Sequence, residues 1–166
     1  MPGVKLIKAS LSIGSNIGDR ILFIKLALKN LEKILKINKI SCIYESMSLK
    51  KDNQRHYYNV VVEVEASYTP EELLKCIKDI ELLVGRRERG NWEEREIDID
   101  IIDYNNSIYK SNNLTIPHYD MQNRSFVLYP LLEINPNYIH PIFKKNVGEM
   151  LKDLTDELNI KKIGGI

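Results

Sequence analysis

The sequence predicts an α+β fold in which an antiparallel sheet is covered by helices on one face. The predicted elements follow the order strand, helix, strand, strand, helix, strand, before further helical pieces. The helical stretches carry apolar residues at helical spacing, whereas the strands alternate in polarity or are rich in β-branched residues. This order is the ferredoxin-like βαββαβ arrangement, which leaves one sheet face open for ligands.

Composition indicates a single domain spanning residues 1–166. A hydrophobic share of 43% is enough to form a core, and a net charge of +1 gives no global case for a nucleic-acid partner. The two cysteines, Cys42 and Cys76, lack CxxC spacing, which fits a reducing compartment. No apolar run approaches the roughly 20 residues of a membrane helix, and no signal-peptide pattern is present. We expect a cytoplasmic monomer that binds no membrane.

The first strand is predicted over residues 4–13 and the first helix over residues 21–35. Between them lies a glycine-containing turn, residues 14–20. A phosphate-binding loop of the Walker type requires Lys-Ser/Thr after its second glycine, but this turn has Asp19-Arg20 there. The pattern therefore favours a tight turn with helix capping over a phosphate loop.

Residues 39–47 and 57–66 have the β-branched and aromatic content of strands, and the segment between them is polar. Thr69 before Pro70, with Glu72 three positions after the threonine, is a strong helix-start signal. This second helix is expected to run to about Val84 and to stop at Gly85. Glu81 lies near the end of this helix, where a lone glutamate is normally solvated.

The next strand alternates acidic and apolar residues from Glu96 onward. Alternate side chains of a strand point to opposite faces, so Ile97, Ile99 and Ile101 should face the core, with Glu96, Asp98 and Asp100 opposite. Carboxylates two apart on one strand face lie only about 6 to 7 Å from each other, so a cation would relieve their repulsion. Asp98 and Asp100 could hold a metal between them. A solvated polar strand face explains the pattern equally well.

Several arginines precede these aspartates: Arg86, Arg87, Arg89 and Arg95. Arginine forks match phosphate oxygens, and Mg²⁺ takes carboxylate and phosphate oxygens, so the cluster suggests a metal–nucleotide site. Taken singly, each arginine is explained as well by a surface ion pair with a neighbouring glutamate.

The remaining chain is predicted to form a hairpin-like piece over residues 104–113, a helix over residues 126–134 and a terminal helix over residues 146–158. His118 follows Pro117 in the connecting loop, with Tyr119 and Arg124 nearby. These side chains could donate to phosphates, although a single loop histidine is more often structural.

Six blocks in order resemble the 6-hydroxymethyl-7,8-dihydropterin pyrophosphokinase family of folate biosynthesis. They cover residues 14–19, 57–59, 81–86, 92–95, 98–100 and 117–126, and the similarity extends over most of the chain. The resemblance implies transfer of pyrophosphate from ATP to the hydroxymethyl oxygen of the reduced pterin, with release of AMP. It also implies two Mg²⁺ ions, both held by Asp98 and Asp100.

The same resemblance implies roles for individual side chains. Arg86 and Arg95 would be catalytic and would lie on loops that close over ATP. The nucleotide site would consist of Glu81, Arg86, Arg95, Ile101, Thr115, His118, Tyr119 and Arg124. The pterin site would consist of Tyr57, Asn59, Trp92 and Phe126, and the backbone around Ser46 and Leu49 would complete it.

The chain departs from the family pattern at three places. Residues 45–50 replace a segment that usually contains a threonine, prolines and a glycine. Glu93 and Glu94 stand where Gly-Pro is common, and two carboxylates near a triphosphate should weaken binding unless they point outward. Asn113 stands where a basic residue is often found.

Two other functions use similar residues. A metal-dependent phosphodiester hydrolase also needs paired aspartates and arginines, but the near-neutral charge disfavours a polyanionic substrate. A nucleotide-sensing module would use Asp98 and Asp100 only to bind Mg-ATP. ATP binding without pterin-dependent formation of AMP would indicate the latter.

Overall fold

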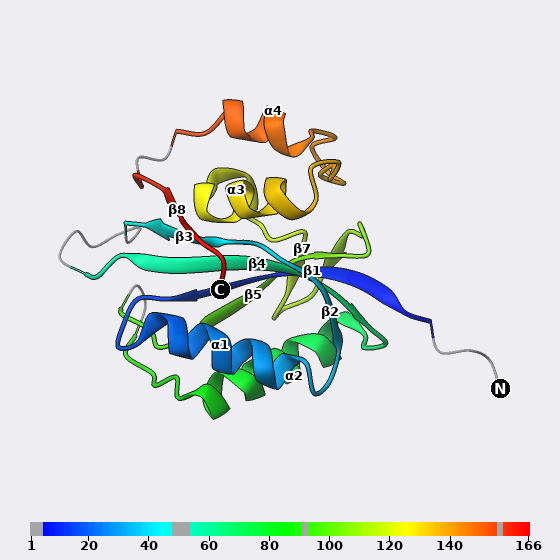
Figure 1. Cartoon of the computed structure of the whole chain (residues 1–166). Helices are drawn as coiled ribbons and strands as arrows, with labels where there is room; N and C mark the ends of the chain where they lie inside the picture. The colour runs from blue at the N-terminus through cyan, green and yellow to red at the C-terminus, as the bar shows by residue number, and fades with distance from the viewer. Residues whose placement is uncertain (1–4, 48–53, 91–92, 156–157) are drawn as a thin grey trace.

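The structure is a computed structural model that describes residues 5–47, 54–90, 93–155 and 158–166 (Figure 1). None of its described helices is long and apolar enough to cross a membrane. The elements are β1 (Ile7–Ser15), α1 (Arg20–Leu31), β2 (Lys36–Ile40), β3 (Ile43–Ser46), β4 (Tyr57–Ala66), α2 (Pro70–Val84), β5 (Asp98–Tyr104), β6 (Tyr109–Lys110), β7 (Thr115–Ile116), a 3-10 turn (Met121–Asn123), α3 (Ser125–Ile134), α4 (Val147–Lys152) and β8 (Lys161–Gly164).

The main sheet is antiparallel throughout and has the order β5-β1-β4-β3-β8, with β2 also paired to β4. Helix α1 follows β1 and helix α2 follows β4, which confirms the predicted βαββαβ order. The acidic strand β5 lies at one edge and pairs with β1 alone among the described strands.

Helices lie on both sides of this sheet (Figure 1). The ferredoxin-like pair α1 and α2 covers one face, as predicted, and encloses the larger apolar core. Helices α3 and α4 cover part of the other face and form a second core with Val61 and Ile102. Asn59 and Asp100, two residues before each of these, therefore share that sheet face. The face is apolar beneath α3 and polar where it is left open.

The strand predicted over residues 39–47 is split into β2 and β3, which both lie along β4. Ser41 occupies the break, where its backbone N–H donates to Val61 O at 3.0 Å and its hydroxyl accepts from Val61 N at 2.9 Å. A side-chain oxygen thus replaces a backbone acceptor, which lets the chain bend without leaving Val61 unpaired.

The predicted boundaries of helix α2 are confirmed. The Thr69 hydroxyl accepts from Glu72 N at 3.3 Å, and the Glu72 carboxylate accepts from Thr69 N at 2.9 Å, so the capping box is complete. Gly85 ends the helix with a φ of +120°, a left-handed conformation that glycine adopts without a steric penalty.

Helix α1 is shorter than predicted and ends at Leu31 rather than at residue 35. Asp19 caps its first turn by accepting from Leu22 N at 3.0 Å, which confirms the capping interpretation. Ile21, the first residue of the predicted helix, is 37% exposed, whereas Leu35, the last, remains buried beyond the end of α1.

The predicted terminal helix over residues 146–158 is wrong in its second half. Helix α4 stops at Lys152, and the chain continues into β8, which pairs with the edge of β3. Met47, just after β3, donates its backbone N–H to Leu158 O at 2.9 Å. The helix pattern did not reveal this strand because its partner lies more than a hundred residues away in the sequence.

Candidate active site

A cavity of about 440 Å³ lies on the open face of the sheet, beside the N-terminal end of β5. Isoleucines 97, 99 and 101 are buried on the opposite side, with exposures of 0, 1 and 3%. The burial predicted for these three isoleucines is thereby confirmed, and Asp98 and Asp100 line the cavity as predicted. Many of the predicted site residues line the cavity: Ser46, Tyr57, Asn59, Arg95, Asp98, Asp100, His118, Tyr119, Arg124 and Phe126.

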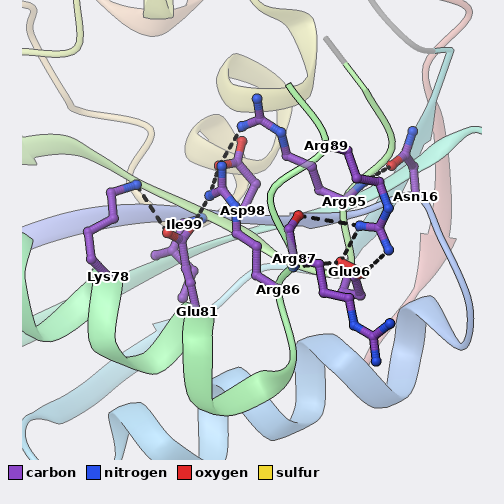
Figure 2. Close-up of polar contacts among 10 residues, drawn as sticks. All are labelled: Asn16, Lys78, Glu81, Arg86, Arg87, Arg89, Arg95, Glu96, Asp98 and Ile99. Atoms are coloured by element: carbon purple, nitrogen blue, oxygen red, sulfur yellow. Dashed lines mark hydrogen bonds and ion pairs between the residues drawn. The ribbon is translucent and has the colours of Figure 1, made fainter. Parts of the chain in front are cut away.

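Asp98 is the meeting point of two arginines. Its Oδ1 lies 3.2 Å from Arg86 Nη1 and 3.4 Å from Arg95 Nη1 (Figure 2). Asp100 lies deeper, and burial together with the nearby Asp98 charge raises the pKa of Asp100 to about 7. A buried carboxyl beside a second carboxylate is characteristic of a site that accepts a cation.

The environment of Glu81 differs most clearly from the one that the helix sequence predicts. Instead of being solvated it is 2% exposed, and it accepts from Arg86 Nη1 at 2.7 Å, Lys78 Nζ at 3.1 Å and Ile99 N at 2.8 Å (Figure 2). Because Ile99 lies between Asp98 and Asp100, Glu81 anchors α2 directly to the acidic strand.

Glu96 does not join the two aspartates at the cavity. Its carboxylate accepts from Arg87 N at 3.3 Å and forms an ion pair with Arg89 (Figure 2). The ion-pair interpretation therefore holds for Arg89. Arg86 pairs with both Glu81 and Asp98, and Arg95 pairs with Asp98.

His118 is joined to the C-terminal part of β5 because its backbone N–H donates to Ile102 O at 2.9 Å. Its Nδ1 accepts from Asp120 N at 3.2 Å, so the ring proton of the neutral histidine is on Nε2. Burial, with a further contribution from the Arg124 charge, lowers the pKa of His118 to about 4. The side chain therefore offers a neutral N–H donor at the cavity wall.

Arg124 and Phe126 lie together on the side of the cavity formed by the start of α3. The Arg124 guanidinium carbon is 5.6 Å from the centre of the Phe126 ring, and its Nε lies 3.3 Å from Asp120 Oδ2. Tyr119 stacks on His118 with ring centres 4.8 Å apart and is 69% exposed at the rim.

The wall opposite contains two buried polar groups that lack partners among the described residues. These are Asn59 Nδ2 and Ser46 Oγ. Asn59 lies over Gly14, and a Cβ at Gly14 would come within 2.3 Å of Asn59 Oδ1. Unpaired buried donors and acceptors are costly, so this wall is suited to a polar heterocycle. Burial, followed by the Asp98 charge, raises the pKa of neighbouring Tyr57 to about 12, so its hydroxyl stays protonated.

Some predicted residues lie elsewhere. Within the described part of the chain, Glu81, Arg86, Ile101 and Thr115 are not part of the cavity lining. Ile101 is in the core, and Thr115 is half-buried on β7. Leu49 and Trp92 lie outside the described residues.

Five lining residues were not proposed for the site from the sequence: Ser12, Gly14, Met47, Lys78 and Glu93. Lys78 could have been suspected, because it lies one helical turn before Glu81 on the same face. Of the two departures at positions 93 and 94, Glu93 is a lining residue of the cavity. Asn113 is exposed on the hairpin, where its N–H donates to Ser111 Oγ at 3.3 Å.

Comparison with known proteins identifies the family. The model of the 7,8-dihydro-6-hydroxymethylpterin-pyrophosphokinase family matches residues 10–136. The chain belongs to this family. Pyrophosphokinases of this family transfer pyrophosphate from ATP to hydroxymethyldihydropterin in folate synthesis, and the chain is accordingly an ATP-dependent transferase.

Individual relatives agree with this assignment. The chain is 46% identical over 145 residues to the 2-amino-4-hydroxy-6-hydroxymethyldihydropteridine pyrophosphokinase of Aquifex aeolicus, covering 87% of this chain and 91% of the relative. For the Haemophilus influenzae pyrophosphokinase the identity is 35%, covering 94% and 98% of the two chains.

Among solved structures, Plasmodium falciparum HPPK-DHPS matches with a TM-score of 0.73 at 18% identity, which supports the fold. The match covers 92% of this chain but only 45% of that one, so this pyrophosphokinase corresponds to part of the larger protein.

Proposed function

We propose that the cavity binds ATP and the reduced pterin side by side, with the triphosphate over Asp98 and Asp100. The observation that carries this proposal is that one cavity brings these two carboxylates, beside Arg95 and Arg86, together with two buried polar groups that lack partners among the described residues. The arginine side suits phosphate oxygens, and the opposite wall suits the edge of a heterocycle.

The aspartates fit magnesium, which the family generally uses with ATP. Mg²⁺ is usually held by one or two carboxylates together with substrate phosphates and water, and Asp98 and Asp100 supply that carboxylate share. We propose that they hold two ions. When bound, the ions would neutralise triphosphate charge and make the β-phosphorus more electrophilic.

Arg86 and Arg95 are proposed to be catalytic. Both contact Asp98 in this structure, and they would exchange this carboxylate for phosphate oxygens once Asp98 binds a cation. His118, Tyr119 and Arg124 would complete the set of phosphate donors. Lys78, which lies 3.1 Å from Glu81, adds a cation on the α2 side of the cavity. Contacts of Glu81, Ile101 and Thr115 with the nucleotide remain proposals from the family resemblance.

The pterin would lie against Asn59, Ser46 and Tyr57, with Phe126 stacked on its ring. Offset aromatic stacking adds about 0.5 to 1.5 kcal/mol beyond the burial of the same area. Leu49 and Trp92 are proposed to complete this site.

In the proposed reaction the hydroxymethyl oxygen attacks the β-phosphorus of ATP. The new bond joins that oxygen to the β-phosphorus, the bond between the α,β-bridging oxygen and the β-phosphorus breaks, the proton of the attacking hydroxyl is released to water, and AMP leaves. The protein requires no covalent nucleophile, because positioning and charge stabilisation carry most phosphoryl transfers.

Product analysis tests these roles. The protein is incubated with Mg-ATP and 6-hydroxymethyl-7,8-dihydropterin, alongside the Asp98→Ala variant and a reaction without pterin. We expect pterin-dependent AMP from the wild type and a loss of at least about a hundredfold in the variant, since a metal ligand is removed. Tight ATP binding without AMP would instead support the nucleotide-sensing alternative.

We also propose that residues 1–166 form one pyrophosphokinase domain, that the protein is a monomer, and that it works in the cytoplasm. The last proposal is supported by the free thiols of Cys42 and Cys76. Light scattering on the purified protein distinguishes a 19.3 kDa monomer from a dimer.

A further inference from the structure

Asn16, in the turn after β1, is completely buried and contacts Arg95 twice. Its backbone N–H donates to Arg95 O at 3.1 Å, and its side-chain Oδ1 accepts from Arg95 N at 2.8 Å (Figure 2). Both backbone polar groups of Arg95 are therefore held by a residue 79 positions earlier in the chain.

The remaining side-chain group of Asn16 is also occupied. Its Nδ2 donates to Gln54 Oε1 and to Arg55 O, both at 3.3 Å. With donors and acceptors on opposite sides, the amide can adopt only one orientation without losing bonds. Asn16 is thereby fixed as an acceptor toward Arg95.

The contact lies at the end of the arginine-rich loop. The loop begins at Gly85 and Arg86, whose N–H groups donate to Glu81 O at 3.2 and 3.0 Å, and it returns to the sheet at Arg95. Between these ends Gly90 has a φ of +96°. From its fixed backbone, the Arg95 guanidinium reaches both Asp98 and the cavity.

We propose that Asn16 is a positioning residue that holds the backbone of Arg95 where its guanidinium can reach the reacting phosphates. Within the described part of the chain, Asn16 itself is not a lining residue of the cavity. The inference rests on the proposed role of Arg95. It gives the turn at residues 14–20 a function that is neither phosphate binding nor helix capping alone.

A double-mutant cycle tests the proposal, with kcat measured for Asn16→Ala, Arg95→Ala and the double variant. Misplacing a catalytic group by about 1 Å can cost on the order of a hundredfold in rate, so Asn16→Ala should lower kcat by about 10- to 100-fold. In the Arg95→Ala background the same substitution should change kcat by less than about twofold. An equal loss in both backgrounds would show a merely structural role and overturn the proposal.

Two control variants distinguish the contact of Asn16 with Arg95 from its contacts with residues 54–55. Asn30→Ala removes an asparagine side-chain bond within α1, from Asn30 Nδ2 to Leu26 O at 2.8 Å, and should leave kcat unchanged because α1 covers the other face of the sheet (Figure 1). Gln54→Ala leaves both Arg95 bonds intact and should retain most of kcat. If Gln54→Ala lowers kcat as much as Asn16→Ala does, the loss arises from the contacts with residues 54–55, and the assignment to Arg95 is wrong.

Hydrogen exchange on the wild-type protein gives a readout besides activity. The Arg95 amide should exchange at least about a hundredfold more slowly than a free loop amide, because a buried side chain accepts its hydrogen bond. If Asn16→Ala does not fold, Asn16→Leu, which has nearly the same shape as asparagine but no acceptor for the Arg95 N–H, replaces it in the cycle, with the same non-additivity expected. If Arg95→Ala retains full kcat, the catalytic role of Arg95 itself is refuted. If Arg95→Ala lowers kcat but the effects of the two substitutions are additive, only the positioning by Asn16 is refuted.

Discussion

At the scale of single residues, the cavity depends on groups whose properties are set by burial. Asn59 and Ser46, which line the cavity, each keep a buried polar atom that has no partner among the described residues, and His118 is kept neutral. The unpaired buried groups cost free energy in the folded protein and are understandable as preparation for a ligand, whereas neutral His118 costs free energy only below about pH 6.5. Two predictions follow the physical causes of these states.

Gly14 should be needed for pterin binding rather than for ATP binding. A Cβ at this position would meet Asn59 Oδ1 at 2.3 Å, so Gly14→Ala must displace the Asn59 amide. We expect the KM for the pterin to rise at least about tenfold, with the KM for ATP within about twofold, because one or two hydrogen bonds are lost. In the control Gly148→Ala, the nearest atom lies 3.4 Å from the new Cβ, and both constants should be unchanged. A rise in both KM values for Gly14→Ala would indicate general disruption instead.

His118 should remain uncharged well below neutral pH. Its pKa in the folded protein is about 4, below the ordinary value of 6.5, so the unfolded chain binds the proton first as the pH falls. The contribution of His118 to stability is therefore complete above about pH 6.5 and is lost between pH 6.5 and pH 4. NMR titration of the histidine ring protons, assigned with His118→Gln, measures this pKa. A midpoint near 6.5 for His118 would contradict the burial argument.

At the scale of elements, strands that form the site are held in place by segments outside the ferredoxin-like unit. Strand β3 carries Ser46, and its outer edge is paired with β8, while Lys162 of β8 lies 3.5 Å from Glu133 of α3. Glu133 also accepts from Tyr44 of β3 at 2.8 Å. The C-terminal segment therefore supports the pterin side of the cavity.

Removing β8 should weaken the pterin side selectively. A chain ending at Thr155 loses the pairing of β3 and the bond from Met47 N to Leu158 O. We expect a lower melting temperature and a higher KM for the pterin, by about 3- to 30-fold, with a smaller effect on ATP. Steady-state kinetics with each substrate varied in turn checks this. Equal increases in both KM values would show that β8 only stabilises the fold.

At the scale of the whole molecule, the fold places two unlike surfaces on the same sheet face. The part beneath α3 and α4 is packed with apolar residues, and the remaining part holds Asp98, Asp100 and Asn59 around the cavity. The electrostatic cost of close carboxylates within this structure should be relieved when a cation binds, so stability and ligand binding are linked.

Mg-ATP should therefore raise the melting temperature of the whole protein. At a ligand concentration of 100 Kd the expected stabilisation is about 2.7 kcal/mol. Chelating the metal with EDTA at the same ATP concentration should remove most of this shift. The Asp100→Asn variant should show a smaller shift than the wild type. Thermal unfolding monitored by fluorescence gives all three values, and a shift that persists in EDTA would refute the metal role of β5.

The sequence by itself determined the features that depend on neighbours along the chain. The capping box of α2, the stop at Gly85 and the alternation of β5 follow from local hydrogen bonding and periodicity, so they could be predicted correctly. The family resemblance supplied the candidate residues, most of which the fold brings to one cavity.

Only the tertiary structure decided the features that depend on partners far away in the sequence. Burial of Glu81 requires Ile99 of β5, the strand β8 requires the edge of β3, and the burial and bonding of Asn16 require the backbone of Arg95. A side chain's own sequence neighbourhood contains no record of such contacts. Their free energy arises when distant segments exclude water from one another and satisfy one another's polar groups.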